Sequence, residues 1–467
     1  MTLDLAYLRY PLPPDVQRLF EAGDFARMEQ VIEKRLADPR VPKALHDRLR
    51  FQLAIARELP AAYPFTQAEL LARLQERISG FREEELEVLR DDGTLDWRYI
   101  DGVVRFKNNC ISSLLKTRPE YVARAINPEP AYAVEARKKA LNDIIDEMKR
   151  RGHAKFRVEL HEEMSIESDR LTPGETLRIH LPLPVVDAQV KEARLLSTTH
   201  TAAFVAPEDE AHRSVYFELP YEPGMTVGAD MAYVIDAPYV EPDPAKVSRE
   251  QPSFDTEEVA PHNVFTPYLR ALAKEIVGDE TNPLKKARLI YNFITTQAVY
   301  RFMPPYLTVT NIPEYFCSGL RGDCGVQALT FITLCRLCGI PARWQAGLYT
   351  PPSGTGNHDW ARFYAAPYGW LFADCSFGGS AWRAGDHDRW NFYFGNLDPW
   401  RLPLCRDFQQ DFNPPKKFLR CDPYDNQNGE AETLERGLTR DEIETDSWII
   451  HSENLNSIHL LKSDERA

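Results

Sequence analysis

The chain has 467 residues, 43% of them hydrophobic and 27% charged, which is typical of a globular protein with enough apolar material for a sizeable core. At roughly 150 residues per domain, this length corresponds to about three domains. The net charge of −14 argues against a nucleic-acid-binding protein, and no apolar run reaches the ~18 residues that a membrane span needs.

The N-terminus and the cysteines indicate the cellular compartment. The first residues lack the basic and then apolar pattern of a signal peptide. Eight cysteines in a chain of this length are too few for a dense disulfide framework. We therefore expect a cytoplasmic protein with free thiols, and neither a nucleic acid nor a membrane as its partner.

The first 150 residues are predicted to form a helical region. Apolar residues recur at helical spacing over 25–37, 43–57, 66–78 and 130–150. Thr66 and Glu69 have the spacing of a capping box, which marks the start of the third of these helices. This region shows no internal repeat and no motif that carries chemistry.

Residues 151–240 change to an alternating pattern that predicts a small antiparallel sheet or sandwich, with Pro-Gly turns at 173–174 and 223–224. The alternating positions are Phe156, Val158 and Leu160; Leu177, Ile179, Leu181 and Leu183; Val215, Phe217 and Leu219; and Val227, Ala229, Met231, Tyr233 and Ile235. The proline-rich stretch 241–262 then predicts an extended linker.

Residues 263–421 are predicted to form an α+β unit. Thr266 and Asn282 each precede a proline, so each is expected to cap the start of a helix. A further helix is expected over 323–339, and strands follow it. From residue 422 onward the chain has 12 acidic and 4 basic residues, which predicts a solvated acidic tail over 422–467.

The chemistry is concentrated around Cys324. Asp323 is expected to be the N-cap of the helix, which places Cys324 at its first position. The helix dipole and free amide groups there favour a thiolate, the form of cysteine that attacks carbonyl carbon. A lone cysteine at a helix start is more often a small buried residue, so the interpretation depends on its partners.

His358 and Asp374 are those partners. Residues 358–364 and 370–374 are predicted to be strands of a hairpin joined by the loop 365–369. If Tyr364 faces Trp370, His358 and Asp374 become diagonal neighbours on one face, within reach of a hydrogen bond. A carboxylate in that position fixes the tautomer of a general-base histidine, whereas Asp359 points to the other face.

These motifs resemble the transglutaminase-like superfamily of papain-like thiol enzymes, in a bacterial-type form. The matching stretches are 321–325 (RGDCG), 338–343 (CGIPAR), 358–360 (HDW) and 369–376 (GWLFADCS), within about 265–380. The resemblance implies a papain-like, transglutaminase-like core with Cys324 as nucleophile, His358 as base and Asp374 as orienting acid. It also makes Tyr300 a candidate oxyanion donor.

The implied activity is acyl chemistry on an amide or peptide carbonyl through a cysteine thioester. Hydrolysis by an amidase or peptidase is favoured over amine cross-linking, with a protein or peptide amide as substrate. The alternative is a binding or scaffolding protein that keeps the fold without turnover. We expect no cofactor and no metal, because a calcium-loop pattern is absent and the Cys335/Cys338 pair has no second pair at metal spacing.

Overall fold

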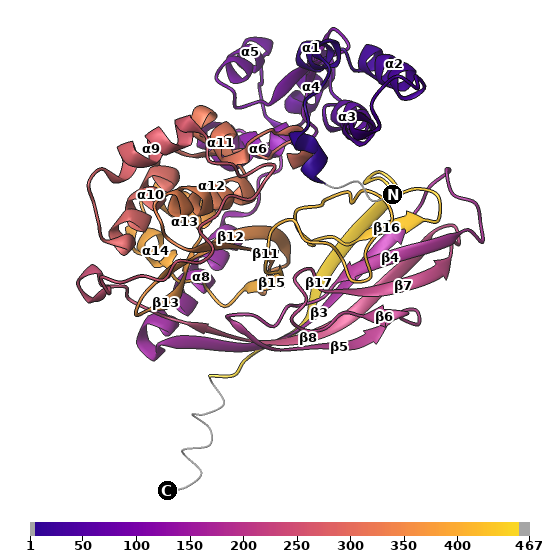
Figure 1. Ribbon diagram of the computed structural model, residues 1–467. Coiled ribbons are helices and arrows are strands. Elements are labelled where there is room, and N and C mark those ends of the chain that lie inside the picture. Colours follow the sequence, from indigo (N-terminus) through magenta and orange to yellow (C-terminus); the bar gives the residue numbers. More distant parts are fainter. Residues whose placement is uncertain (1–4, 457–467) are drawn as a thin grey trace, which may run out of the picture.

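The computed structural model describes residues 5–456, which form three connected parts (Figure 1). A helical region lies at the top of Figure 1, a β unit lies at the lower right, and a helix-covered sheet lies at the left. Helices and antiparallel sheets are mixed throughout, so the predicted α+β class is confirmed. Within the described range, none of the helices has the length and apolar character to cross a membrane.

The N-terminal region is mainly helical. Its elements are η1 (Leu5–Arg9), α1 (Pro14–Ala22), α2 (Phe25–Leu36), α3 (Lys43–Ala62), α4 (Gln67–Arg77), α5 (Glu83–Asp91), β1 (Trp97–Ile100), β2 (Val103–Phe106), α6 (Cys110–Thr117) and α7 (Pro119–Val122). The long helix α8 (Ala131–Arg151) follows in the chain, lies lower in Figure 1 and leads into the β unit. The capping box of Thr66 and Glu69 is present at the start of α4. The β1–β2 hairpin was not predicted, although its turn residues Asp101 and Gly102, both with positive φ, have a typical hairpin-turn sequence.

The β unit contains two four-stranded antiparallel sheets that share buried apolar side chains. Its strands are β3 (His153–Ile166), β4 (Thr176–Pro182), β5 (Val190–Thr198), β6 (Phe204–Val205), β7 (Ser214–Pro220), β8 (Met225–Pro238), β16 (Glu430–Thr433) and β17 (Ile443–Asn454). The strand orders are β16-β4-β7-β6 and β17-β3-β8-β5. The four alternating segments of the sequence are therefore strands β3, β4, β7 and β8.

The acidic C-terminal segment is not the solvated tail that its composition predicts. Strand β16 pairs with β4 and strand β17 pairs with β3, so this segment supplies one edge strand to each sheet. The buried carboxylate of Glu430 accepts from Lys416 at 2.7 Å and from Arg420 at 2.9 Å. Acidic residues that look solvated in the sequence are thus paired with cations in the fold; residues 457–467 of the predicted tail lie outside the described range.

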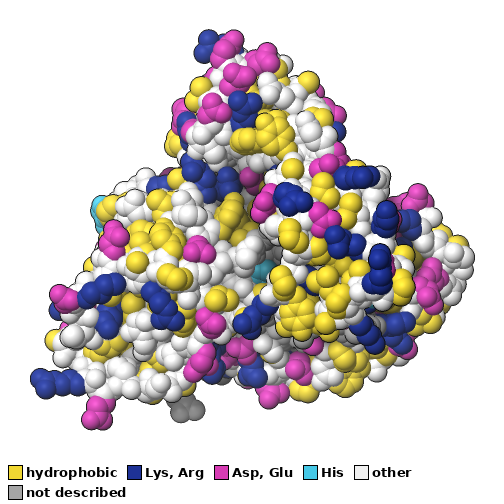
Figure 2. Space-filling model, turned by 45° about the horizontal axis from the view of Figure 1, so that its top comes forward, with side chains coloured by type: hydrophobic (Ala, Val, Ile, Leu, Met, Phe, Trp, Pro, Cys, Tyr) yellow, Lys and Arg dark blue, Asp and Glu magenta, His cyan; other side chains and the backbone are white. Residues whose placement is uncertain are grey.

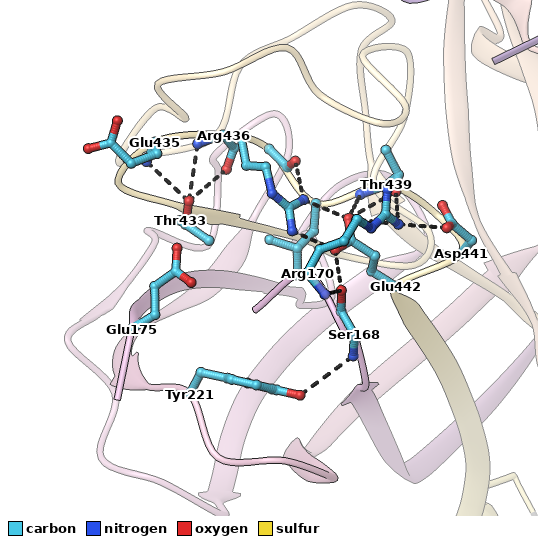
Figure 3. Close-up of polar contacts among 12 residues, drawn as sticks. Ser168, Arg170, Glu175, Tyr221, Thr433, Glu435, Arg436, Thr439, Asp441 and Glu442 are labelled. Atoms are coloured by element: carbon cyan, nitrogen blue, oxygen red, sulfur yellow. Dashed lines mark hydrogen bonds and ion pairs between the residues drawn. The ribbon is translucent and has the colours of Figure 1, made fainter. Parts of the chain in front are cut away.

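Glu442 shows how this segment is attached to the β unit (Figure 3). Its carboxylate accepts from the Ser168 hydroxyl at 2.6 Å and from the Arg436 guanidinium at 2.6 Å. The backbone N–H and hydroxyl of Thr439 donate to the same carboxylate at 3.0 and 2.9 Å. Burial alone would raise the pKa of Glu442, but the hydrogen bonds from Arg436 and Ser168 outweigh burial and lower it to about 2.

The third part consists of helices packed on a five-stranded antiparallel sheet of order β14-β13-β12-β11-β15. Its helices are α9 (Pro267–Val277), α10 (Pro283–Gln297), η3 (Tyr306–Thr308), α11 (Ile312–Gly319), α12 (Cys324–Leu337), α13 (Cys375–Arg383) and α14 (His387–Phe392). Its strands are β9 (Val299–Tyr300), β10 (Arg321–Gly322), β11 (Ala342–Tyr349), β12 (Gly356–Ala365), β13 (Gly369–Ala373), β14 (Phe394–Gly395) and β15 (Arg401–Cys405). Thr266 and Asn282 cap α9 and α10, as predicted.

The proline-rich stretch 241–262 lies along this third part and contains one short helix, η2 (Pro244–Lys246). The backbone N–H of Asp243 donates to the Tyr368 hydroxyl at 2.8 Å, and the N–H of Ser248 donates to the Ala366 carbonyl at 2.9 Å. The Asp255 carboxylate pairs with Arg343 at 2.5 Å. These contacts fasten the stretch to the hairpin and to strand β11.

Replacing Glu442 with Gln is expected to lower the free energy of unfolding by about 2 kcal/mol at neutral pH, because it weakens charge-assisted hydrogen bonds at a buried site. The ordinary pKa of this group is 4.5, and the folded value is about 2. Its contribution is therefore fully present above about pH 4.5 and is lost as the pH falls toward 2. Urea unfolding of E442Q and wild type across this pH range measures both effects.

The matched control is Glu435→Gln, which removes an exposed carboxylate on the same segment. We expect its free energy of unfolding to stay within about 0.5 kcal/mol of wild type. Equal stability of E442Q and wild type at pH 7 would show that the segment contributes little to the fold.

Candidate functional site

Cys324 is the first residue of α12, as predicted. The Asp323 carboxylate caps this helix by accepting from the Val326 N–H at 3.0 Å, and it also accepts from the Tyr306 hydroxyl at 2.7 Å. Helix α12 is apolar on all sides, because it is enclosed by the sheet and the neighbouring helices. The cysteine is thus held at a fixed point against strand β12.

Gly325 allows the first turn of α12 to approach β12. A Cβ atom at this position would lie 2.8 Å from Oδ2 of Asp359 and would overlap the hydroxyl of Tyr306. Any larger residue would therefore push the helix start away from the strand that carries His358. The glycine in the RGDCG stretch has a packing role beside the cysteine.

His358 and Asp374 are in direct contact. The predicted register is confirmed, because Tyr364 faces Trp370 across the β12–β13 hairpin. Nε2 of His358 lies 2.8 Å from Oδ2 of Asp374, and both side chains are buried. With an ionised carboxylate as partner, Nε2 carries the proton, which leaves the lone pair on Nδ1 to accept one.

Arg401 of strand β15 holds the charge of Asp374. Its Nη2 lies 3.0 Å from Oδ2 of Asp374 and 3.0 Å from Oδ2 of Asp398, and none of the three side chains is exposed. The guanidinium also lies 4.0 Å from the ring centre of Phe377. Burial alone would raise the pKa of Asp374, but His358 and Arg401 outweigh burial and hold the pKa below its usual value.

His358 is neutral in the resting molecule. Burial lowers the pKa of His358 below its usual value, although Asp374 acts in the opposite direction. The positive charges of Arg401 and Lys116 lower this pKa further. A neutral imidazole with Nε2 directed to a carboxylate is the form that a general base requires.

The thiol of Cys324 contacts Asp359, the residue that follows His358. Sγ lies 3.3 Å from Oδ2 of Asp359, and among the described residues the polar contacts of Sγ include this carboxyl and Tyr300 but no hydrogen bond to His358. Burial raises the pKa of Cys324 well above its usual value, and Asp359 and Asp323 raise it further. The predicted thiolate is therefore wrong for the resting molecule, because burial and two carboxyl groups outweigh the helix start.

Asp359 is itself perturbed. Burial and the nearby Asp323 raise the pKa of Asp359 well above its usual value. Its Oδ1 accepts from Nε2 of Gln427 at 2.7 Å. Although Asp359 lies on the opposite strand face from His358, as predicted, it faces the cysteine, which the sequence did not indicate.

Tyr300 lies beside Cys324. Strands β9 and β10 pair in parallel so that Tyr300 faces Gly322, two residues before the cysteine. Burial raises the pKa of Tyr300, and Cys324 raises it further by its charge and by a hydrogen bond to the hydroxyl. The tyrosine therefore keeps its proton at neutral pH and is available as a hydrogen-bond donor at the site.

Two further residues of the site were missed from the sequence, Arg401 and Gln427. Nε2 of Gln427 donates to Asp359 and to the backbone carbonyls of His358 and Gly347, at 3.1 and 3.2 Å for the carbonyls. Gln427 belongs to the segment that was predicted to be a solvated tail. No local pattern marks either residue, because both reach the site only through the sheet topology.

The arrangement can carry out nucleophilic chemistry with groups of the chain itself. Within the described residues, no cluster of three or more His, Cys, Asp and Glu side chains is arranged to hold a metal ion. The groups available for it are the thiol at the start of α12, the oriented imidazole of His358, and two sources of hydrogen-bond donors, the Tyr300 hydroxyl and the α12 backbone.

Comparisons with known proteins find solved structures of low sequence identity to this chain. Among solved structures, a proposed cysteine protease from Cytophaga hutchinsonii is 14% identical, with a TM-score of 0.41, and the match covers 65% of this chain and 91% of that one. The periplasmic domain of TgpA from Pseudomonas aeruginosa is 17% identical, with a TM-score of 0.27 and coverage of 53% and 96%. A search of curated proteins finds no match.

The family assignment rests on sequence. Residues 270–375 match the transglutaminase-like superfamily, and this range contains Cys324, His358 and Asp374. The match confirms, for this stretch of the chain, the resemblance that the motifs indicate.

Proposed function

We propose that this protein is a cysteine-dependent enzyme that transfers the acyl group of a protein or peptide amide through a thioester on Cys324. The observation that carries the proposal is the buried contact of His358 with Asp374 at 2.8 Å, next to the helix start that holds the cysteine. A histidine oriented in this way beside a cysteine is the arrangement by which thiols are activated in acyl transfer.

The first half of the reaction forms the thioester. Nδ1 of His358 takes the proton of the Cys324 thiol as Sγ attacks the carbonyl carbon. Asp374 stabilises the imidazolium, and the α12 backbone and the Tyr300 hydroxyl donate to the oxygen that becomes negative. The tetrahedral intermediate then collapses, the C–N bond breaks, and His358 gives its proton to the departing amine.

The second half releases the acyl group. His358, now neutral, takes a proton from water or from an amine as that nucleophile attacks the thioester carbonyl. The C–S bond breaks and the thiol is restored with the proton from His358. We favour hydrolysis over amine transfer, because water needs no second binding site.

A non-catalytic binding protein is the second candidate. It is favoured by the contact of Cys324 with Asp359 and by the raised pKa of its thiol, which keeps the resting cysteine in its unreactive form. The two candidates differ in whether an acyl group can be placed on Cys324.

An active ester tests this difference without knowledge of the substrate. We expect p-nitrophenyl acetate to acetylate the protein with release of one p-nitrophenolate in a burst, and peptide mass spectrometry to place the acetyl group on Cys324. Cys324→Ala should abolish the burst. Addition of hydroxylamine then measures how far an amine competes with water for the thioester.

The controls for the burst are Cys338→Ala, which removes a half-buried thiol at the opposite end of α12 from Cys324, and His358→Gln. C338A should acetylate like wild type, whereas H358Q should lose the burst or release the acetyl group at least 10²-fold more slowly. A burst that persists in C324A, or acetylation of another cysteine, would contradict the enzyme and favour the binding protein.

Replacing Asp374 with Asn is expected to lower turnover by roughly 10⁴, because the amide no longer holds the proton on Nε2 of His358. Asn keeps the cap to the Phe377 N–H, which Asp374 now accepts at 2.9 Å, so the fold should persist. Deacetylation rates together with circular dichroism separate the two effects. A loss below tenfold with native spectra would show that Asp374 does not orient the base.

Replacing Asp359 with Asn is expected to lower the pKa of Cys324. The Asp359 carboxyl raises that pKa, so its removal makes the thiolate accessible at lower pH. The pH dependence of Cys324 alkylation by iodoacetamide measures this shift, with Glu435→Gln as a control that should leave the profile unchanged. A profile that moves to higher pH in D359N would contradict the role assigned to Asp359.

A further inference from the structure

Two cations of different elements lie beside the site. Nζ of Lys116, on helix α6 of the N-terminal region, lies 3.9 Å from the ring centre of Tyr300 and 5.4 Å from that of Phe302. The guanidinium of Arg383, at the end of helix α13, donates to the Ala298 carbonyl at 3.1 Å, two residues before Tyr300. Figure 2 shows Lys and Arg side chains gathered where the upper lobe meets the lobe at its left.

The ammonium of Lys116 is close to the reacting groups. Tyr300, which lies under it, is hydrogen-bonded to Cys324. Lys116 also interacts electrostatically with Cys324, Asp323 and Arg383, and its charge is one of those that lower the pKa of His358. The N-terminal region therefore brings a positive charge close to Tyr300 and Cys324, where it also acts on His358.

This charge has no ion-pair partner among the described residues. Within residues 5–456 no ion pair involves Lys116, although the chain as a whole carries a net charge of −14 and many of its surface cations are paired. Both Lys116 and Arg383 are exposed, so an external anion can reach them. An exposed cation that packs on aromatic rings and has no ion pair is open to an anionic ligand.

We propose that Lys116 and Arg383 form a subsite for a carboxylate of the substrate, which makes acidic peptides the preferred substrate class. This inference rests on the proposed function, because it assigns the specificity of the same site. The carboxylate belongs either to an acidic side chain next to the reacting amide or to the C-terminus of the peptide.

The chemistry of the reaction gives the subsite a second consequence. Thioester formation converts neutral His358 into an imidazolium, and the nearby charge of Lys116 opposes this step. A substrate carboxylate bound to Lys116 would cancel that opposition, whereas a neutral substrate would leave it in place. The preference for substrates with a carboxylate then affects turnover as well as binding.

A pair of alkylating agents that differ by one charge tests the subsite. Iodoacetate carries a carboxylate and iodoacetamide does not, and both alkylate the same thiol. We measure the ratio of their rates at Cys324 by peptide mass spectrometry, relative to the ratio for free N-acetylcysteine. Lys116→Gln should lower this ratio at least threefold by reducing the iodoacetate rate, and Arg383→Gln should lower it in the same direction.

The matched control is Lys139→Gln on helix α8, which removes an exposed lysine paired with Asp143 at 2.6 Å and should leave the ratio within twofold of wild type. Addition of 0.5 M NaCl to wild type should lower the ratio without any mutation, so the test does not depend on the folding of a variant. A salt-independent ratio, or a ratio in folded K116Q that falls less than threefold, would overturn the subsite.

The same assay separates failure of the subsite from failure of the proposed function. If Cys324 reacts with iodoacetamide at a normal rate and only the charge dependence is missing, the subsite alone is wrong. If Cys324 reacts with neither reagent while other thiols do, the enzyme itself is wrong and the subsite falls with it.

Protection of Cys324 from iodoacetamide identifies the source of the carboxylate. The α-amide of N-acetylaspartate, which has a free side-chain carboxylate, is compared with N-acetylalanine, which has a free terminal carboxylate, and with the uncharged N-acetylalaninamide. Protection by one carboxylate but not by the amide, lost in K116Q, supports the subsite and assigns its ligand. Equal protection by all three compounds would contradict it.

Discussion

Asp374 joins three elements through one buried carboxylate. It caps helix α13, accepts from His358 on β12 and faces Arg401 on β15. A fully buried carboxylate is stable only when its oxygens are paired, so a rotation of any partner would leave a charge without compensation. The orientation of His358 therefore depends on the position of the edge strand β15, which carries Arg401.

The C-terminal segment couples the β unit to the same site. After Gln427 reaches Asp359 and the carbonyls of β11 and β12, the chain continues directly into β16 and later β17, the edge strands of the two sheets. The amide of Gln427 thus holds strand β12, which carries His358. The strands that follow it in the chain, β16 and β17, complete the two sheets of the β unit. Loss of strand pairing at either sheet edge would therefore disturb the position of Asp359, whose carboxyl group contacts Cys324.

Local features of the site could be predicted from sequence because they are encoded within a few residues. The cap Asp323 lies next to Cys324, and the register of the hairpin follows from a five-residue loop between His358 and Asp374. These short-range relations fixed the contact of His358 with Asp374 and the start of the helix.

The remaining features depend on partners that are distant in sequence. Arg401 meets Asp374 across 27 residues and Gln427 meets Asp359 across 68, and neither pair has a motif. The acidity of 422–467 predicted a tail because composition does not show that Glu430 would face Lys416. The thiolate was predicted from the helix start alone, whereas burial, which decides its pKa, arises only from tertiary packing.

Charge balance explains why the resting site and the reacting site differ. A neutral thiol and a neutral imidazole are the stable pair at this buried site, because burial disfavours the charged forms of both groups. The two carboxylates of Asp374 and Asp398 pair with the single positive charge of Arg401. Their second negative charge balances the imidazolium that forms when Cys324 attacks. Within the described residues Lys116 forms no ion pair of this kind, although Asp323 acts on it electrostatically. A positive charge without an ion pair therefore lies beside the reacting groups, where a bound carboxylate would balance it.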